Sequence, residues 1–449
     1  MTLRIPTSLL LLFIGQFCFA QKAELVYQPK NMDSIQKYIG NITLKKIKSF
    51  EGQYEKDIQK TLNERKDAFI KTIKDSNYIF DSRINNYFKN ILAEIYRANP
   101  DIDHQDFYFF VDKSPVPNAA CYGNGIFTVN LGLFNVLDTD DEIAFTICHE
   151  IAHYKLKHTD KSLLEYISKA NSKQTKQDLK KASKQDYGAT RAVMEVLKTI
   201  NYNFLKRSRL AETEADSLGY VFLSKTRFNK AAGYVSLKKL GECDTILFKA
   251  DTKLREHFTF DDYPFNEAWL ERDAAIFDLK EARDDFAFNK DSLKTHPDIP
   301  LRLKKLESLY SGKDGIAPTP ALDAVRKIVV ESSIAASMDD SDIDMALYQI
   351  LTMYTRKEID EKTYAKNVAY LLRRTYELKQ AHNFGKYVGP VTTFSEEKYL
   401  DEVKLFLNHL ELKQTRKIGH RFCQKHQALM KGDAEFAATA EFFAKLNTN

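Results

Sequence analysis

The sequence predicts an α+β fold that is mostly α-helical, with one small antiparallel β-sheet and a helical C-terminal region. Three observations predict this class. Apolar residues recur at helical spacing along most of the 449 residues. Strand-like stretches are confined to DFYFFVD at 106–112 and NAACYGNGIFTVNLGLF at 118–134. Residues 321–449 fit helix almost throughout, with a strong turn signal only at NFGKYVGPV, residues 383–391.

The first 20 residues have the features of a secretory signal peptide. One arginine precedes an apolar run from Leu9 to Ile14, and small residues precede a cut at Ala20–Gln21. The run is shorter than the roughly 20 residues that span a bilayer. Lipoprotein anchoring at Cys18 is not expected, because bulky Phe17 stands where a small residue is needed. We therefore expect a periplasmic or secreted mature protein.

The segments that follow predict helices and then a hairpin. Residues 21–75 predict an N-terminal helical arm, because SFEGQYEKDIQKTLNERKDAFIKTIKD has helical periodicity. From Ser82, the pattern IxxYFxxILxxIY predicts an amphipathic helix that ends near Asn99–Pro100. A β-hairpin follows the first strand, with Gly123-Asn124-Gly125 as its turn and residues 126–129 as its return strand.

The stretch TICHEIAHYKLKH contains the pattern HExxH. Its helix begins with Asp140-Asp141, and acidic residues suit the positive end of a helix dipole. Positions i and i+4 of a helix share one face, so His149 and His153 can bind one zinc ion. Glu150 stands beside them, placed to take a proton from a water molecule at the metal.

A catalytic zinc site needs a third protein ligand, and RLAETEADSLG offers carboxylates for it. Glu212 and Asp216 are again i and i+4. One of them can bind the metal while the other accepts the N–H of a ligand histidine and fixes its tautomer. Glu214 lies between them, and we interpret it as turned away. His158 follows His153 by five residues, and we interpret it as a polar residue on another helix face.

The cysteines and the net charge bear on two other kinds of site, a cysteine-bound metal and a nucleic-acid interface. Outside the leader stand Cys121, Cys148, Cys243 and Cys423, without a CxxC pair, so zinc ligation by cysteine is not expected. An even count permits disulfides in an oxidising compartment, although Cys148 within the motif helix is better interpreted as a buried hydrophobe. The net charge of +5 is too small to indicate a nucleic-acid partner.

Composition also suggests domain limits. From Lys161 to Arg209 there are twelve Lys or Arg against four Asp or Glu, which predicts a solvated helical insertion at 159–207; the alternative is a lid or a contact with an anionic surface. The Gly- and Pro-containing stretch SGKDGIAPTP predicts a linker. The expected units are 1–20 (signal peptide), 21–75 (arm), 76–312 (catalytic domain), 313–320 (linker) and 321–449 (helical C-terminal domain).

The motifs together resemble a known family. HExxH followed by ExxxD within RLAETEAD is similar to the gluzincin pattern of the HtpX and CAAX-prenyl-protease family of zinc metallopeptidases. The similarity extends through NAACYGNGIFTVNLGLFNVLDTDDEIAFTICHEIAHYKLKH, and THPDIPLR matches the family feature HPxxxxR. It covers residues 80–310, and the absence of long apolar segments resembles the soluble periplasmic, BepA-like branch. The resemblance implies a zincin-like domain.

The resemblance also implies residue roles. One Zn²⁺ per chain would be bound by His149, His153 and Glu212, with Glu150 as general base. Asp216 would orient His149. His296 would lie near the metal and stabilise the oxyanion or cap the zinc at rest, and Arg302 would support the His296 loop through an ion pair.

The first function hypothesis is a zinc metalloendopeptidase that hydrolyses unfolded or flexible envelope proteins in periplasmic quality control, a role that the resemblance alone implies. An edge strand formed by Gly125, Ile126, Phe127 and Thr128 would bind the extended substrate by strand addition. Further expected contacts are envelope proteins at the C-terminal helical domain and a peripheral membrane contact. The alternative hypothesis is a chaperone-like client-binding module with a latent zinc site, capped by His296 and the basic insertion.

Overall fold

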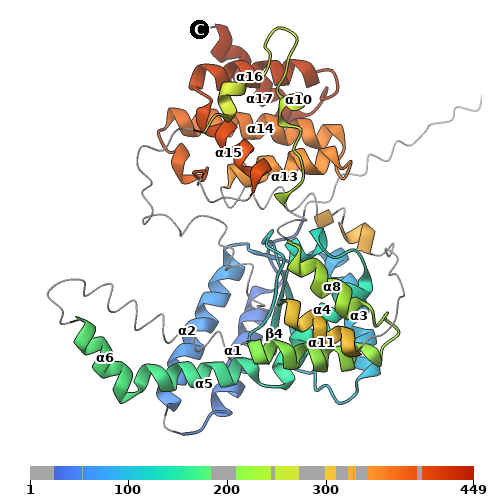
Figure 1. Cartoon of the computed structure of the whole chain (residues 1–449), viewed down its shortest axis with the longest axis vertical. Coiled ribbons are helices and arrows are strands. Elements are labelled where there is room, and N and C mark those ends of the chain that lie inside the picture. The colour runs from blue at the N-terminus through green and yellow to red at the C-terminus, as the bar shows by residue number, and fades with distance from the viewer. Residues whose placement is uncertain are drawn as a thin grey trace, which may run out of the picture.

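The computed structural model describes residues 25–52, 54–183, 209–243, 248–272, 299–309, 322–326, 328–329, 342–391 and 397–448. The predicted signal peptide, the predicted linker at 313–320 and His296 lie outside these ranges. The described part consists mostly of helices around one small sheet, which confirms the predicted α+β class. Figure 1 shows two halves, one built around the sheet and one built from the C-terminal helices.

The sheet has four strands in the order β1-β2-β4-β3. The strands are β1 (Tyr78–Ile79), β2 (Tyr108–Asp112), β3 (Ala119–Cys121) and β4 (Ile126–Asn130). The hairpin prediction is confirmed, because β3 pairs antiparallel with β4 and both Gly123 and Gly125 adopt positive φ in the turn. However, β2 pairs parallel with β4, so the sheet is mixed and not wholly antiparallel.

The expectation that Gly125, Ile126, Phe127 and Thr128 form the edge strand is wrong. Strand β4 lies between β2 and β3 and is hydrogen-bonded on both sides. Its first four residues are buried, whereas β3 is partly exposed. The burial is the physical reason: the more apolar strand of the hairpin takes the interior position, where it can pair with β2. The edge beside the helix that carries HExxH is β3.

One face of the sheet packs against the helix that carries HExxH. This helix, α4 (Asp140–Lys155), begins with a capping box between Thr139 and Glu142, and its first turn is acidic as predicted. Phe127 and Val129 of β4 belong to the hydrophobic core shared with α4. The other helices of this half are η1 (Leu131–Asn135), α3 (Ser82–Ala98), α5 (His158–Asn171), α6 (Lys173–Ser183), residues 209–224, α8 (Ala232–Gly241) and α11 (Ile299–Leu309).

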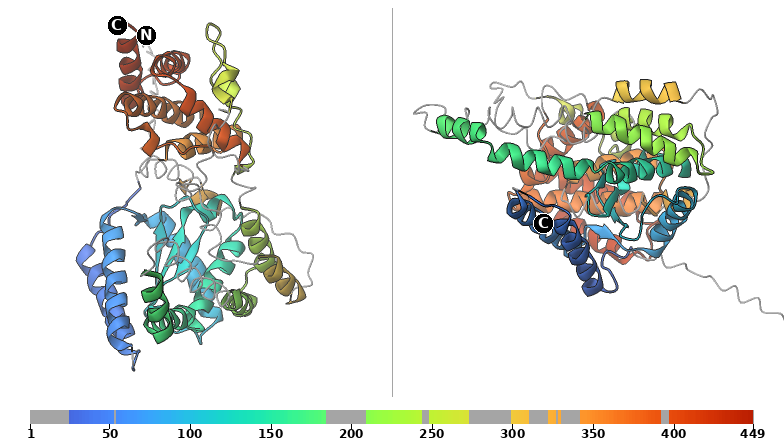
Figure 2. Two further views of the ribbon diagram at one scale, coloured as in Figure 1. Left: turned by 60° about the vertical axis from the view of Figure 1, so that its left-hand side comes forward. Right: turned by 90° about the horizontal axis from the view of Figure 1, so that it is seen from below.

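The N-terminal arm covers the opposite face of the sheet. It consists of α1 (Met32–Lys48) and α2 (Glu55–Lys74), which pack on each other. The Phe69 ring of α2 packs at a tilt against Tyr78 and edge-to-face against Phe110, and Ile126 belongs to the same cluster. Because side chains alternate along β4, Ile126 faces the arm while Phe127 faces α4. The arm is therefore part of the fold of this half, as the left view of Figure 2 shows.

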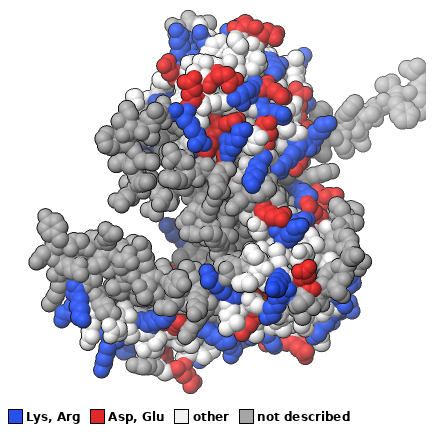
Figure 3. Space-filling model, in the orientation of Figure 1, with Lys and Arg blue, Asp and Glu red and all other residues white. Residues whose placement is uncertain are grey.

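The C-terminal half is a helical bundle with its own core. Its elements are α10 (Leu254–His257), η2 (Glu267–Leu270), α13 (Ile343–Thr355), α14 (Glu361–Gln380), η3 (Phe384–Lys386), α15 (Lys398–His409), α16 (Leu412–His426) and α17 (Ala434–Thr448). Positive and negative side chains are interspersed over the visible face of this bundle (Figure 3). None of the described helices combines the length and apolar character that a membrane span requires.

Two segments pack in a different half from the one that the predicted domain limits assign to them. Phe258 and Trp269, expected in the catalytic domain, are buried in the core of the C-terminal bundle. Leu322 and Val325, expected in the C-terminal domain, are buried in the core that contains α4. The hydrophobic packing of the described residues therefore does not follow the predicted domain limits.

Candidate metal centre

Helix α4 fixes the two histidines from within the core. Every residue of α4 from Glu142 to Ala152 is buried, so the helix is held on all sides by packing. The positions of His149, Glu150 and His153 on α4 are those that the helical spacing predicts. The two imidazoles share one face of the helix. A buried helix is a rigid support for groups that must keep a fixed geometry.

Glu212 completes a three-residue cluster with these imidazoles. Nε2 of His149 lies 3.0 Å from Nε2 of His153, and the Glu212 carboxylate oxygens lie 3.5 Å and 3.3 Å from these two nitrogens. A tetrahedral zinc ion with bonds of about 2.0–2.1 Å holds its ligand atoms ~3.3 Å apart. The observed separations match that spacing. Two imidazoles and one carboxylate also form the donor set of a catalytic zinc site that keeps an open position.

A glycine lets the helix that carries Glu212 approach α4 closely. A Cβ placed on Gly219 would lie 3.0 Å from both the backbone nitrogen and the Cα of His149. Any larger residue would push residues 209–224 away from α4. Gly219 therefore helps to bring the third carboxylate within reach of the histidine pair, and the sequence reasoning missed it.

Asp216 and Arg302 support the cluster on the side away from the Nε2 atoms of the histidines. Nδ1 of His149 lies 2.9 Å from Oδ1 of Asp216, which confirms that the two are neighbours. Arg302 donates two hydrogen bonds to Asp216, at 2.6 Å and 2.7 Å, and its Nη1 lies 3.1 Å from Glu212. The ion pair of Arg302 is therefore made with Asp216 and Glu212. The proposed support of the His296 loop lies outside the described residues.

The buried charges of this cluster shift one another's pKa values. Burial alone would lower the pKa of His149, but its contacts with Asp216 and Glu212 outweigh burial and raise the pKa to about 10. Burial would raise the pKa of Asp216, but Arg302 and His149 lower it to about 2. The buried carboxylates thus favour a positive charge at His149, and a divalent cation bound there would supply that charge in place of a proton.

Glu150 is buried beside the cluster, on the side of the edge strand. Burial and the nearby Glu150 carboxylate both raise the pKa of the Cys121 thiol at the end of β3. Burial alone would lower the pKa of Arg302, but Asp216, Glu212 and, last, the Glu150 charge outweigh burial and raise it. The Glu150 carboxylate is therefore close enough to act on both Cys121 and Arg302.

The interpretation of His158 as a polar residue on another helix face is wrong, whereas Glu214, with a side chain that is 46% exposed, lies outside the metal cluster as interpreted. His158 is only 6% exposed, its Nδ1 lies 3.0 Å from Nδ1 of His153, and its Nε2 lies 3.1 Å from Oε2 of Glu214. Helix α4 ends at Lys155, and Lys157 adopts a left-handed conformation with φ 56°, which turns His158 back towards His153. A positive φ at a lysine gives no signal in a single sequence.

The four cysteines of the described part of the chain lie apart from the metal cluster. Cys121, Cys148, Cys243 and Cys423 are all free, and none belongs to the cluster formed by the two histidines and Glu212. Cys148 is fully buried among apolar side chains, as interpreted from its place in the motif helix.

Comparison with known proteins assigns the chain to a family. The sequence pattern described as peptidase family M48 matches residues 82–310, a segment that contains the histidine pair, Glu212, Asp216 and Arg302. The chain has no match among the curated proteins with which it was compared. The matched segment is more than half of the 449 residues and carries the potential metal site. The chain belongs to peptidase family M48, a family of metal-dependent peptidases.

Proposed function

We propose that this protein is a zinc-dependent endopeptidase that cuts unfolded or flexible proteins. The observation that carries the proposal is the cluster of His149, His153 and Glu212, in which two separate helices bring three donor groups to zinc-like spacing beside Glu150. A closed structural zinc site would use four protein ligands, whereas the described residues offer three, the number that a catalytic zinc site uses beside water and substrate.

The residues around the cluster have distinct roles in the proposed hydrolysis. When bound, zinc would polarise the scissile carbonyl and lower the pKa of a water molecule at the site. Glu150 takes the proton of the attacking water and delivers it to the leaving amine. Asp216, held by Arg302, keeps His149 in the tautomer that presents Nε2. His296, proposed from the resemblance, would stabilise the oxyanion.

Strand β3 is the proposed binding edge for the substrate backbone. In the described part of the chain it has a strand partner on one side only. Tyr122 donates its N–H to the carbonyl of Ile126, and Asn130 donates to the carbonyl of Asn118. In an antiparallel pair, hydrogen-bonded and non-hydrogen-bonded positions alternate, so the odd-numbered residues of β3 direct their backbone groups outwards.

Those outward positions support binding of an extended peptide close to the catalytic base. Ala119 and Cys121 are the two residues concerned, and Cys121 is near Glu150. The hydroxyl of Thr159 already donates to the Cys121 carbonyl at 3.0 Å, which would end the ladder on that side. Strand addition needs a segment without its own secondary structure, which favours unfolded substrates.

The cellular setting rests on the leader sequence. Residues 1–20 carry the signal-peptide pattern, so we place the mature chain in the periplasm or outside the cell and its substrates among envelope proteins. The quality-control role rests on the family resemblance. Mass spectrometry of the secreted protein tests the location, because it should find Gln21 as the first residue.

The test of the catalytic proposal compares the wild type with Glu150→Gln on denatured casein. The wild type should contain about one zinc per chain and cleave casein, while Glu150→Gln should keep the zinc and lose about 10²–10⁴-fold in rate. Glu165→Gln is the matched control, because Glu165 pairs with Lys169 on the same face of α5 and should leave the rate unchanged. A zinc-loaded wild type without cleavage, or an active Glu150→Gln, would refute the proposal.

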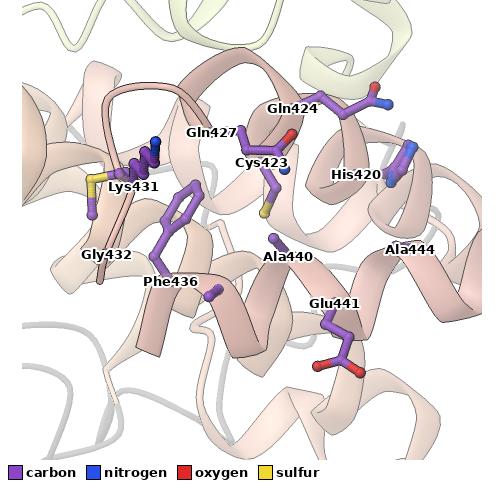
Figure 4. Close-up of a pocket in the computed structure, with 12 residues that line it drawn as sticks. His420, Cys423, Gln424, Gln427, Lys431, Gly432, Phe436, Ala440, Glu441 and Ala444 are labelled. Carbon is purple, nitrogen blue, oxygen red and sulfur yellow. The ribbon is translucent and has the colours of Figure 1, made fainter. Parts of the chain in front are cut away.

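A hollow in the C-terminal bundle favours a second candidate function, the binding of client proteins without cleavage. Helices α16 and α17 border a cavity of about 520 Å³. Figure 4 shows Cys423 and Ala440 facing each other across it, with Phe436 on the adjoining wall. If this hollow binds apolar side chains of clients, Ala440→Trp should fill it and weaken the suppression of client aggregation by the Glu150→Gln protein. Unchanged suppression would speak against the hollow.

A further inference from the structure

The first turn of α5 is directed at the metal centre by three contacts made by consecutive residues. His158 contacts the ligand His153, Thr159 donates to the edge strand, and Asp160 forms an ion pair with Lys46 of the N-terminal arm. The ion pair is largely shielded, with side-chain exposures of 17% and 14%. The turn is therefore fixed on three sides, and the His158 imidazole is held in place beside His153.

The nitrogen atoms of this contact allow a single consistent arrangement of protons when a metal is bound. A metal at Nε2 of His153 leaves the proton on Nδ1, which must then donate. Nδ1 of His158, 3.0 Å away, accepts that hydrogen bond. The proton of His158 then resides on Nε2, which lies 3.1 Å from Oε2 of Glu214 and donates to this carboxylate.

The helix at residues 209–224 supplies support for both ligand histidines. Asp216 contacts Nδ1 of His149 directly, whereas Glu214 reaches Nδ1 of His153 through His158. Positions i and i+2 of a helix point in different directions, so Glu214 can contact His158 while Glu212 faces both imidazoles and Asp216 contacts His149. The same helix also carries the third ligand, Glu212.

We propose that His158 and Glu214 are positioning residues that fix the tautomer and ring orientation of His153 for metal binding. The proposal rests on the proposed zinc site. The alternative role for His158 is that of an ordinary buried histidine whose two nitrogens happen to be satisfied. The two roles differ in what they stabilise: a positioning relay strengthens metal binding, whereas a core histidine stabilises the fold with or without metal.

The test measures the zinc affinity of the full chain by competition with a chromogenic chelator, together with thermal unfolding in the presence of EDTA. His158→Leu keeps a similar volume and removes both nitrogens. His158→Asn keeps an oxygen near the position of Nδ1 and can still accept from His153. Glu214→Gln keeps the shape of a side chain that is 46% exposed and removes its charge.

The relay predicts a graded loss of metal affinity. His158→Leu should bind zinc about 10- to 100-fold more weakly than the wild type, and His158→Asn should recover most of that loss. Glu214→Gln should fall between His158→Asn and the wild type, while the control Glu165→Gln should match the wild type. In EDTA, the melting temperatures of all four variants should stay close to that of the wild type.

Two outcomes would overturn the relay. The first is a zinc affinity of His158→Leu within about twofold of the wild type, a much smaller change than an outer partner of a ligand histidine normally causes. The second is equal weakening in His158→Leu and His158→Asn with a matching loss of stability in EDTA, which would indicate a core histidine. A wild type that binds no zinc would instead refute the metal centre itself.

Discussion

Arg302→Met tests whether the buried network behind the metal centre holds the two carboxylates as the structure implies. Arg302, Glu212 and Asp216 are each 3% exposed or less, and Arg302 contacts both acids. Methionine keeps much of the side-chain volume but leaves Asp216 and Glu212 without their cation. Removing one partner of a buried ion pair costs about 3–5 kcal/mol. For a domain of roughly 150–250 residues this corresponds to a melting temperature lower by about 6–20 °C.

The assay is thermal unfolding followed by circular dichroism, in EDTA and again with zinc. The loss should be largest in EDTA and smaller with zinc, because a divalent cation balances part of the uncompensated carboxylate charge. Arg302→Lys, which keeps the charge but not the forked donors, should lose less. Arg97→Met is the control, because Arg97 pairs with Glu94 on the surface, where ion pairs contribute little. If Arg302→Met melts within 2 °C of Arg97→Met in EDTA, as a rough threshold, the reasoning fails.

Three further predictions test other contacts. Gly219→Ala should cost about 1–3 kcal/mol in urea unfolding and weaken zinc binding, because its Cβ would press on the His149 backbone; unchanged zinc affinity would contradict this. Burial lowers the pKa of His257 to about 4, so the unfolded chain binds this proton first as the pH falls. Stability should therefore decline between about pH 6.5 and 4, and His257→Phe should flatten the decline measured by urea titration at several pH values; equal slopes would refute it. Gly419→Ala should destabilise the C-terminal bundle by about 1–3 kcal/mol, because the added methyl would overlap the Phe443 ring; a change below 0.5 kcal/mol, roughly the scale of neutral surface substitutions, would contradict the packing.

The part of the site that follows from one helical period could be predicted from the sequence. His149 and His153 on α4, and Glu212 and Asp216 on the second helix, are each separated by one turn, so the pattern specified both pairs before any fold was known. The structure distinguishes the two acids, because Glu212 lies near Nε2 of both histidines while Asp216 contacts Nδ1 of His149.

The rest depended on features that have no local signature. The contact of His158 with His153 does not follow from helical spacing, because the left-handed residue Lys157 ends the regular helix and reverses the direction of the His158 side chain. The edge strand does not follow from the sequence, because a hairpin pattern does not indicate which of its two strands pairs with a third strand. In the structure β2 pairs parallel with β4, across a connection that is long enough to leave several choices open.

The interleaved packing of the two halves has a consequence for how this protein can be handled and how it can evolve. The chain leaves the catalytic core after Cys243, contributes Trp269 to the C-terminal bundle, returns for Leu306 and Val325, and departs again before Ile343. No single cut can release a complete half, since a fragment ending near residue 310 would lack the returning segment and carry Trp269 uncovered. Neither half can therefore be expressed alone, or exchanged between proteins, as an independently folding unit. Deletion of the bundle should lower the solubility of the catalytic half before it changes the residues of the metal centre.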